Sequence, residues 1–323
     1  MKKCNVKMFL IVLFLIFGGS SLSSAQAVSC LRESSLKWIP FFWEGDSISG
    51  KYIEKAYLYV PVKIEDLPYD FSMQLDLGTS NTQFYGIPLK PYLSESTSLA
   101  NKLGDYQGTA KDALFTNVNL KMGNVDFQCD ILHFQKRGEE IPKDSLHSKT
   151  PKHIGTIAPD IFKDKILIID YRLCRFSVLD SLPAEYKDLP AKTFELDEGI
   201  VKIPFRINGT EQKLMFDTGS SPFPLATSKE RALEIACPTI IDSLSGPLWW
   251  GQEITFYGLE VNKHIEFDGV VLENTKVYYD RDGLWEEGVF KPLGIWGLTG
   301  NACFFDHVVI LDYKNKLFRI DRN

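Results

Sequence analysis

Gln74-Leu-Asp-Leu-Gly-Thr-Ser80 recurs in the second half of the chain as Met215-Phe-Asp-Thr-Gly-Ser-Ser221. In both copies an apolar residue precedes an Asp-Xaa-Gly turn, and a hydroxyl-bearing residue follows the glycine. One such turn says little, because Asp and Gly are common in ordinary turns after strands. Two copies become informative if the surrounding chain repeats with them.

The surrounding chain does repeat, and its spacing is nearly the same. Ala158–Tyr171 matches Gly300–Tyr313, and the two segments share their apolar positions and two aspartates. Upstream, Val60–Ile64 matches Ile203–Ile207. Three matches that occur in the same order at almost one offset indicate the duplication of a unit of about 140 residues.

Both copies consist mainly of short runs of β-branched and aromatic residues bounded by turn residues, which is typical of strands. We expect strands at Tyr57–Ile64, Leu114–Leu120, Val125–Leu132, Ile166–Asp170, Arg175–Leu179, Ile200–Ile207, Lys213–Phe216, Ile254–Tyr257, Val270–Leu272, Lys276–Tyr279, Val308–Asp312 and Leu317–Ile320. Ser228 is a candidate N-cap for a helix ending at Ile235, and Pro159–Lys163 suggests a single helical turn. This pattern predicts an all-β fold of two barrel-like or sandwich-like units.

The duplicated Asp-Xaa-Gly-Thr/Ser motif resembles the active-site signature of the pepsin-like aspartic proteases, a family related to the retropepsins. The resemblance covers residues 48–323. It implies two homologous β-barrel-like lobes, at 48–181 and 199–323, with an interlobe linker at 182–198 that is rich in proline and charged residues. The active site would lie in the cleft between the lobes, with Asp76 and Asp217 as its catalytic pair.

The chemistry of this family requires two carboxyl groups close enough to share one proton. The ionised carboxylate then activates a water molecule, and the protonated carboxyl polarises the peptide carbonyl. Gly78 and Gly219 would allow tight loops whose amides bind the carboxylates. Thr79 and Ser220 would donate hydroxyl hydrogen bonds to the neighbouring carboxylate. No metal or cofactor is needed.

A second family signature, two apolar residues followed by glycine, lies beneath each catalytic loop. Leu298–Gly300 matches it in the second copy, and Thr156–Ala158 in the first, where alanine replaces the glycine. The residue after the catalytic aspartate is usually Thr or Ser, and the two hydroxyls form hydrogen bonds across the lobe interface. Thr218 keeps this group, whereas Leu77 departs from the pattern.

The loss of one buried hydrogen bond costs about 1 kcal/mol, so Leu77 need not abolish catalysis. The sequence therefore predicts an aspartic endopeptidase that acts on extended polypeptides. The alternative is a catalytically impaired protein on the same scaffold, either a peptide-binding protein that holds its ligand by strand addition or a surface lipoprotein.

In this family a hairpin of the first lobe closes over the substrate and carries a tyrosine. Gly104–Thr109, ahead of the strand at Leu114–Leu120, is the expected position of this hairpin, and Tyr106 is its candidate substrate-binding residue. The aromatic-rich segment Gly246–Gly251 and Tyr257 are candidates for a specificity pocket, although core packing is the commoner role of such residues.

The N-terminal segment, 1–27, is typical of a secretory signal peptide. Three lysines precede an apolar run, Met8–Phe17, that is too short to span a bilayer, and small residues offer cleavage after Ala25 or Ala27. Cys30 leaves lipid anchoring as an alternative. We expect an exported protein of bacterial type, periplasmic or extracellular, monomeric and in contact with a membrane only if lipidated.

Charge and cysteine content exclude several other classes. With 42 acidic and 36 basic residues and no basic stripe, nothing predicts nucleic-acid binding. Cysteines and histidines lack metal-ligand spacing. After the signal segment the cysteines are Cys30, Cys129, Cys174, Cys237 and Cys303; pairs 129–174 and 237–303 are the simplest disulfide hypothesis, although spacing alone does not fix connectivity.

Overall fold

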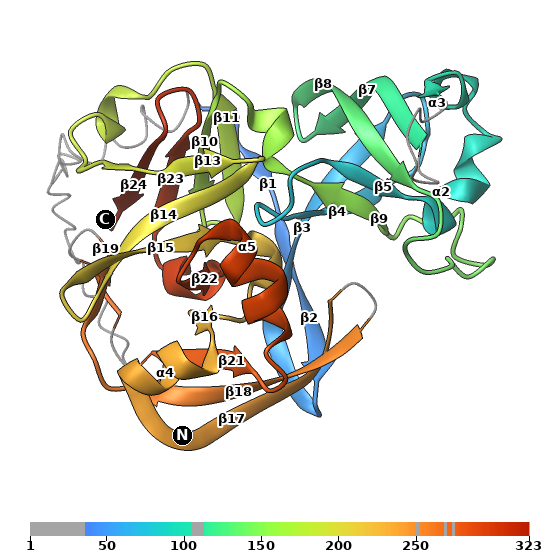
Figure 1. Cartoon of the computed structure of the whole chain (residues 1–323). Helices are drawn as coiled ribbons and strands as arrows, with labels where there is room; N and C mark the ends of the chain where they lie inside the picture. The colour runs from blue at the N-terminus through green and yellow to red at the C-terminus, as the bar shows by residue number, and fades with distance from the viewer. Residues whose placement is uncertain (1–35, 105–112, 250–251, 268–269, 273–274, 323) are drawn as a thin grey trace, which may run out of the picture. The chain divides into compact units, whose positions relative to one another are not determined.

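A computed structural model describes residues 36–104, 113–249, 252–267, 270–272 and 275–322. The chain from Lys37 onward forms one compact unit. Its regular structure is mostly β, in three sheets accompanied by short helices (Figure 1). The all-β class predicted from the sequence is thereby confirmed.

The first half of the chain builds an eight-stranded sheet in the order β2-β3-β4-β9-β5-β8-β7-β6. Its strands are β2 Phe42–Ile48, β3 Lys51–Ile64, β4 Phe71–Leu75, β5 Gln83–Tyr85, β6 Leu103–Gly104, β7 Ala113–Met122, β8 Val125–Phe134 and β9 Lys152–Ile157. Two helices, α2 (Gly86–Leu93) and α3 (Thr97–Ala100), follow β5. Alternate residues of β3 from Ala56 to Ile64 are buried, as expected for a strand with one face on the core.

The second half builds a ten-stranded sheet in the order β17-β18-β21-β16-β22-β15-β14-β19-β20, with β13 also paired to β14. Its strands are β13 Glu195–Asp197, β14 Ile200–Ile207, β15 Thr210–Phe216, β16 Ala226–Thr227, β17 Ala236–Trp249, β18 Gln252–Val261, β19 Ile265–Phe267, β20 Val270–Val271, β21 Lys276–Asp280 and β22 Gly297–Thr299. Helix α4 (Lys229–Ile235) begins after Ser228, whose side chain accepts the N–H of Arg231, as the capping pattern predicted.

The two sheets share one connectivity. The path β3-β4-β9-β5-β8-β7-β6 in the first corresponds strand for strand to β14-β15-β22-β16-β21-β18-β17 in the second. In both paths the second and third strands pair in parallel, as do the fourth and fifth, and every other pair is antiparallel. The sequence duplication is therefore also a duplication of topology.

The third sheet contains strands from both halves, in the order β1-β11-β10-β23-β24-β12. Its strands are β1 Ile39–Pro40, β10 Ile166–Asp170, β11 Arg175–Leu179, β12 Lys192–Thr193, β23 Val308–Asp312 and β24 Leu317–Asp321. At its centre the repeated strands β10 and β23 pair antiparallel, with Ile168 opposite Ile310. Because these residues are equivalent in the repeat, a local two-fold axis passes between them.

The β2–β3 hairpin reaches from the eight-stranded sheet to strand β17 of the other (Figure 1). The Ser49 hydroxyl donates to the carbonyl oxygen of Ser245 at 2.7 Å, and Lys51 forms an ion pair with Asp242 at 2.9 Å. The two halves of the chain are therefore linked by polar contacts as well as by the shared sheet.

Every strand predicted from the sequence has a counterpart. The single turn predicted at Pro159–Lys163 is η1 (Pro159–Phe162), and η5 (Asn301–Phe304) lies at the equivalent place in the second repeat. The long strand β17 was missed, because Pro238 and Gly246 with intervening polar residues hide its pattern; three register shifts accommodate them. The π-helix η4 (Glu286–Phe290) and the short helix α5 (Lys291–Leu293) that continues it were also missed.

The disulfide hypothesis is wrong, since Cys129, Cys174, Cys237 and Cys303 are all free thiols. Cys129 lies on β8, whereas Cys174 lies between β10 and β11 in another sheet. Cys237 is at the start of β17, whereas Cys303 lies in η5 with its thiol against the carbonyl of Pro224 at 3.0 Å. Membership of one repeat therefore does not bring the cysteines together.

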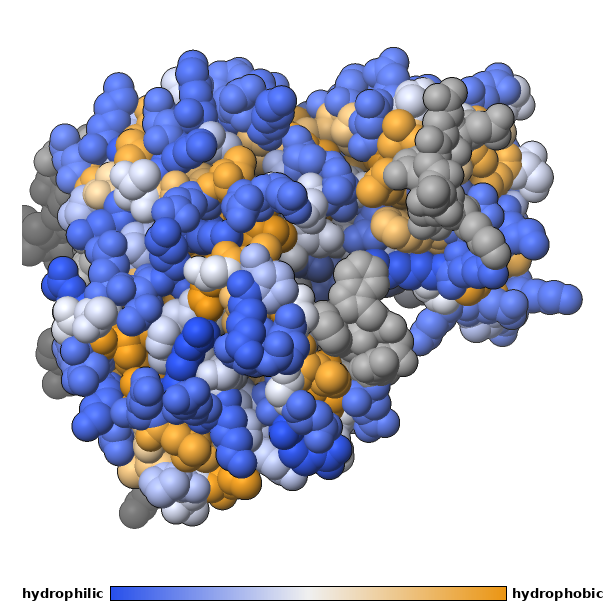
Figure 2. Space-filling model, in the orientation of Figure 1, coloured by the Kyte–Doolittle hydropathy of each residue, from blue (hydrophilic) through white to orange (hydrophobic). Residues whose placement is uncertain are grey.

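The face of the protein drawn in Figure 2 is covered mainly by hydrophilic residues, with hydrophobic ones interspersed between them. None of the helices in the described ranges has the length and apolar character that a membrane span requires. The signal segment (residues 1–27) and Cys30 lie outside the described residues.

Candidate active site

Asp76 and Asp217 occupy equivalent positions in the two sheets, each directly after the C-terminal end of a strand, β4 or β15. The N–H of Asp76 donates to the carbonyl of Ile157, and the N–H of Asp217 to that of Thr299, each at 2.9 Å. These acceptors belong to the two second-signature segments, which therefore lie beside the aspartate loops as the resemblance implied.

The glycines of the two motifs show that the aspartates converge. A methyl group added to Gly78 would lie no farther than 2.8 Å from the carboxyl atoms of Asp217. One added to Gly219 would lie no farther than 2.7 Å from those of Asp76. Each glycine thus packs against the carboxyl group of the other copy, and a Cβ atom at either position would force that carboxyl group to move.

Backbone and hydroxyl donors hold the two carboxylates. Gly78 N–H donates to Asp76 Oδ1, and Gly219 N–H to Asp217 Oδ1, each at 2.9 Å. Asp217 also caps the short turn η3 (Thr218–Ser220) and accepts the Ser220 amide at 3.2 Å and its hydroxyl at 2.7 Å. Thr79, the counterpart of Ser220, makes no such bond to Asp76 within the described part of the chain. Asp217 is therefore the better stabilised carboxylate.

This difference in hydrogen bonding indicates which aspartate of the pair carries the proton. Burial, then the charge of Asp217, raises the pKa of Asp76 well above its ordinary value. Burial also raises the pKa of Asp217, but hydrogen bonds from Ser220, Asp76 and Gly219 oppose that rise. Each carboxyl group also acts on the other: Asp217 raises the pKa of Asp76, and Asp76 lowers that of Asp217. We therefore assign the shared proton to Asp76 and the negative charge to Asp217.

Thr218 connects the two aspartate loops. Its hydroxyl accepts the N–H of Leu77 at 2.9 Å and donates to the carbonyl of Leu75 at 2.7 Å. Both Thr218 and Leu77 are fully buried. Of the two crossing hydroxyls that the resemblance implied, that of Thr218 is thus present. Leu77 has an apolar side chain at the equivalent position in the first repeat.

Sequence reasoning missed the buried polar support below Thr218. The Asn301 side chain donates to the carbonyl of Thr218 at 2.8 Å and accepts the hydroxyl of Tyr171 at 2.7 Å. Because Tyr171 follows β10, this chain of bonds connects the second aspartate loop to an element of the first half. The position of Asn301, directly after the second signature at Gly300, was the available clue.

The proposed substrate-binding residue, Tyr106, lies outside the described residues, as do Trp250 and Gly251 of the aromatic segment. The strands on either side of Tyr106, β6 and β7, correspond in topology to β17 and β18. Tyr257 lies on β18 and packs edge-on against Tyr279, with ring centroids 5.8 Å apart. That contact is with a neighbouring strand of its own sheet.

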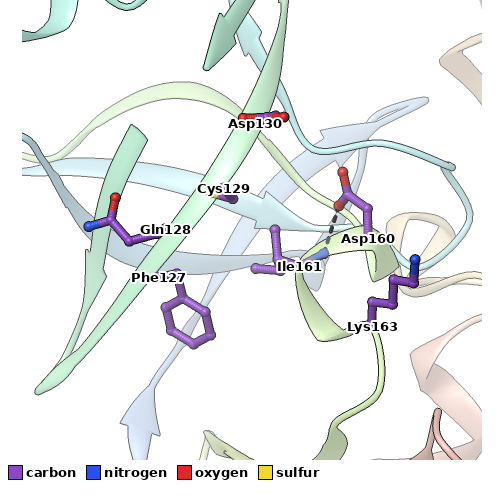
Figure 3. A pocket seen from close by; sticks show the side chains of 7 residues that line it. All are labelled: Phe127, Gln128, Cys129, Asp130, Asp160, Ile161 and Lys163. Atoms are coloured by element: carbon purple, nitrogen blue, oxygen red, sulfur yellow. Dashed lines mark hydrogen bonds between the residues drawn. The ribbon is translucent and has the colours of Figure 1, made fainter. Parts of the chain in front are cut away.

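A separate hollow of about 270 Å³ lies between β8 and η1 (Figure 3). Among its lining residues, Asp160 has both carboxylate oxygens bonded to the backbone and hydroxyl of Thr82, at 2.8 and 2.6 Å. Asp160 thereby anchors the chain that follows the first aspartate loop. Its hydrogen-bonding capacity is used within the fold, so the aspartate pair is the stronger candidate site.

No protein-family model matches this chain, and no curated protein matches it. Its function must therefore be inferred from the geometry of the site.

Proposed function

We propose that this protein is an aspartic endopeptidase of the pepsin-like fold. In this proposal residues 48–181 and 199–323 are its two lobes, 182–198 joins them, and an extended polypeptide lies between them. The observation that carries the proposal is the reciprocal packing of Gly78 on Asp217 and of Gly219 on Asp76. Two carboxyl groups that approach so closely hold one proton between them at moderate pH.

The assigned protonation states give each aspartate a role. The Asp217 carboxylate takes a proton from a water molecule placed between the two carboxyl groups, while Asp76 donates its proton to the oxygen of the scissile carbonyl. The water oxygen bonds to the carbonyl carbon and forms a tetrahedral intermediate. As the C–N bond breaks, Asp217 gives the proton it took from water to the leaving amine, and Asp76 takes back the proton from the former carbonyl oxygen as the carboxylic acid product forms. The original state, with one proton on Asp76, is thereby restored.

Leu77 is the feature that favours a binding protein without activity. Its N–H is nevertheless held by the Thr218 hydroxyl, so the first aspartate loop is fixed from the opposite repeat despite the missing side-chain hydroxyl. The buried Leu77 side chain supplies apolar packing at the position where the second crossing bond would be. We therefore favour the active enzyme.

The test is proteolysis of an unfolded protein substrate between about pH 3 and 7, the range in which a shared carboxyl proton titrates. Wild type is compared with Asp76→Asn, Asp217→Asn and, as a matched control, Asp188→Asn, an exposed aspartate in 182–198. We expect both active-site variants to lose at least about 1,000-fold in rate, because neither retains a shared proton, and the control to keep wild-type activity. Equal cleavage by all four proteins would remove the pair from the mechanism.

A further inference from the structure

A row of polar side chains crosses the eight-stranded sheet beside Asp76. In the strand register Tyr59 of β3 lies opposite Gln74 of β4, Gln74 opposite Thr156 of β9, and Thr156 opposite Gln83 of β5. Residues opposite one another in neighbouring strands share a face of the sheet. Gln74 precedes Asp76 by two residues, so this face leads to the aspartate pair, and Gln74 donates to the carbonyl of Gly219 at 3.4 Å.

Arg137, on the segment after β8, lies at the end of this row. One of its terminal guanidinium nitrogens, Nη1, donates to the side-chain oxygen of Gln83 at 2.8 Å, and the guanidinium lies 4.7 Å from the ring centre of Tyr85. The Tyr85 hydroxyl is itself hydrogen-bonded to the Thr156 hydroxyl at 2.6 Å. These contacts fix the direction of an arginine side chain that is otherwise exposed.

The charge of Arg137 is available to a ligand. Among the residues that the structure describes, no carboxylate forms an ion pair with it, and only Nη1 of its guanidinium has a hydrogen-bond partner. Its charge reaches the active site, where it contributes to lowering the pKa of Asp76 against the larger opposing effect of burial.

The neighbouring histidine does not share this role. His153 stacks on Tyr59 with ring centroids 4.5 Å apart. Burial, aided by the charge of Arg137, lowers its pKa to about 4, so it is neutral above that pH. Arg137 therefore gives this face a positive charge at any pH at which the enzyme would work.

We propose that Arg137 binds a carboxylate of the substrate, so that the enzyme prefers Asp or Glu within a few residues of the scissile bond, on the side that lies over the eight-stranded sheet. This inference rests on the proposed peptidase function. A guanidinium recognises a carboxylate through paired N–H donors, and Arg137 retains such donors because Gln83 uses only one of its nitrogens. Gln83 and Tyr85 act as positioning residues for Arg137.

The test uses matched peptides that differ only by Glu or Gln at each position near the cleavage site. We expect wild type to cleave the best Glu peptide at least about tenfold faster, in kcat/KM, than its Gln partner, as a charge-assisted hydrogen bond near the surface allows. In Arg137→Gln the ratio should fall to about one. Arg137→Lys should retain part of the preference, and Lys136→Gln, an exposed neighbouring change, all of it.

Binding to the Asp217→Asn protein, measured by fluorescence anisotropy with the same peptides, separates this inference from the proposed function. Cleavage without any preference for Glu overturns the inference and leaves the peptidase standing. Glu-dependent binding that requires Arg137, without cleavage by wild type, supports the inference and overturns the peptidase. A lack of both cleavage and Glu-dependent binding overturns both.

Discussion

The side-chain oxygen of Thr218 lies 2.9 Å from the backbone nitrogen of Leu77, which is 141 residues earlier in the chain. Since the same oxygen donates to Leu75, one hydroxyl holds the strand end and the loop that surround Asp76. Leu77 has no hydroxyl, so its side chain cannot form the converse bonds. The crossing hydroxyl bonds between the two aspartate loops therefore come from Thr218 alone among the two residues that follow the aspartates.

Thr218→Val should test the role of these crossing bonds. Valine has nearly the same shape but leaves the Leu77 amide and the Leu75 carbonyl without their partner in a buried site. We expect a loss of about 1–3 kcal/mol in the free energy of unfolding, measured by urea denaturation, and at least a tenfold loss of peptidase activity. Thr193→Val, at an exposed position of β12, is the control. A variant as stable and active as wild type would show that the crossing bonds are dispensable.

Leu77→Thr should restore the missing hydroxyl. The substitution gives up part of the apolar burial of Leu77, which is worth about 1–2 kcal/mol, and gains the converse crossing bonds. We expect a folded protein whose turnover equals or exceeds that of wild type. Activity is measured together with the urea midpoint. If the variant fails to fold, Leu77 is packed into an interface that cannot accept a polar group.

Gly78→Ala and Gly219→Ala should be equally damaging, because each added methyl group overlaps the carboxyl group of the opposite aspartate. We expect both variants to lose at least about 100-fold in kcat, with a measurable loss of stability, as the aspartates move apart. Full activity in either variant would mean that the carboxyl groups do not approach each other as described.

The free energy of unfolding should depend on pH because the pKa of Asp76 is raised in the folded protein. The folded state binds this proton more tightly than the unfolded chain. The resulting stabilisation is therefore fully present below the ordinary aspartate pKa, and it is lost as pH rises through the raised pKa of Asp76. Asp76→Asn, which is neutral at every pH, escapes this loss. Its stability relative to wild type should therefore increase as pH rises above the ordinary aspartate pKa.

Urea denaturation at several pH values measures this difference, with Asp188→Asn as the control that should show no such trend. A relative stability of Asp76→Asn that is constant or declines with pH would contradict the raised pKa. Peptidase activity should fall over the same rise in pH, since Asp76 then loses the proton it donates to the carbonyl.

The sequence predicted the parts of the site that depend on local chain geometry. The glycines, the aspartates and the hydroxyls of Thr218 and Ser220 belong to short motifs whose geometry is local, and the repeat placed those motifs at equivalent points. Ser228 was likewise identified as a cap from its neighbours alone. A feature confined to one turn or one strand end can therefore be predicted from the neighbouring residues in the sequence.

The remainder depends on pairing between distant strands. Arg137, Gln83 and Thr156 come together only through the order β4-β9-β5-β8, which no local pattern reveals. The register of β9 also decides that His153 stacks on Tyr59. The disulfide prediction failed for the same reason, since the positions of the cysteines in the repeat give no information about the sheet on which each one lies.

The most direct test is to follow the aspartate carboxyl carbons by NMR during a pH titration of wild type and of Asp217→Asn. The proposal predicts that Asp76 of wild type remains protonated at a pH at which ordinary aspartates are already ionised. Because burial and the charge of Asp217 together raise the pKa of Asp76, the Asp217→Asn substitution should lower that pKa. If Asp76 ionises in the ordinary aspartate range and does not respond to Asp217→Asn, the two carboxyl groups share no proton, and the proposed mechanism is contradicted.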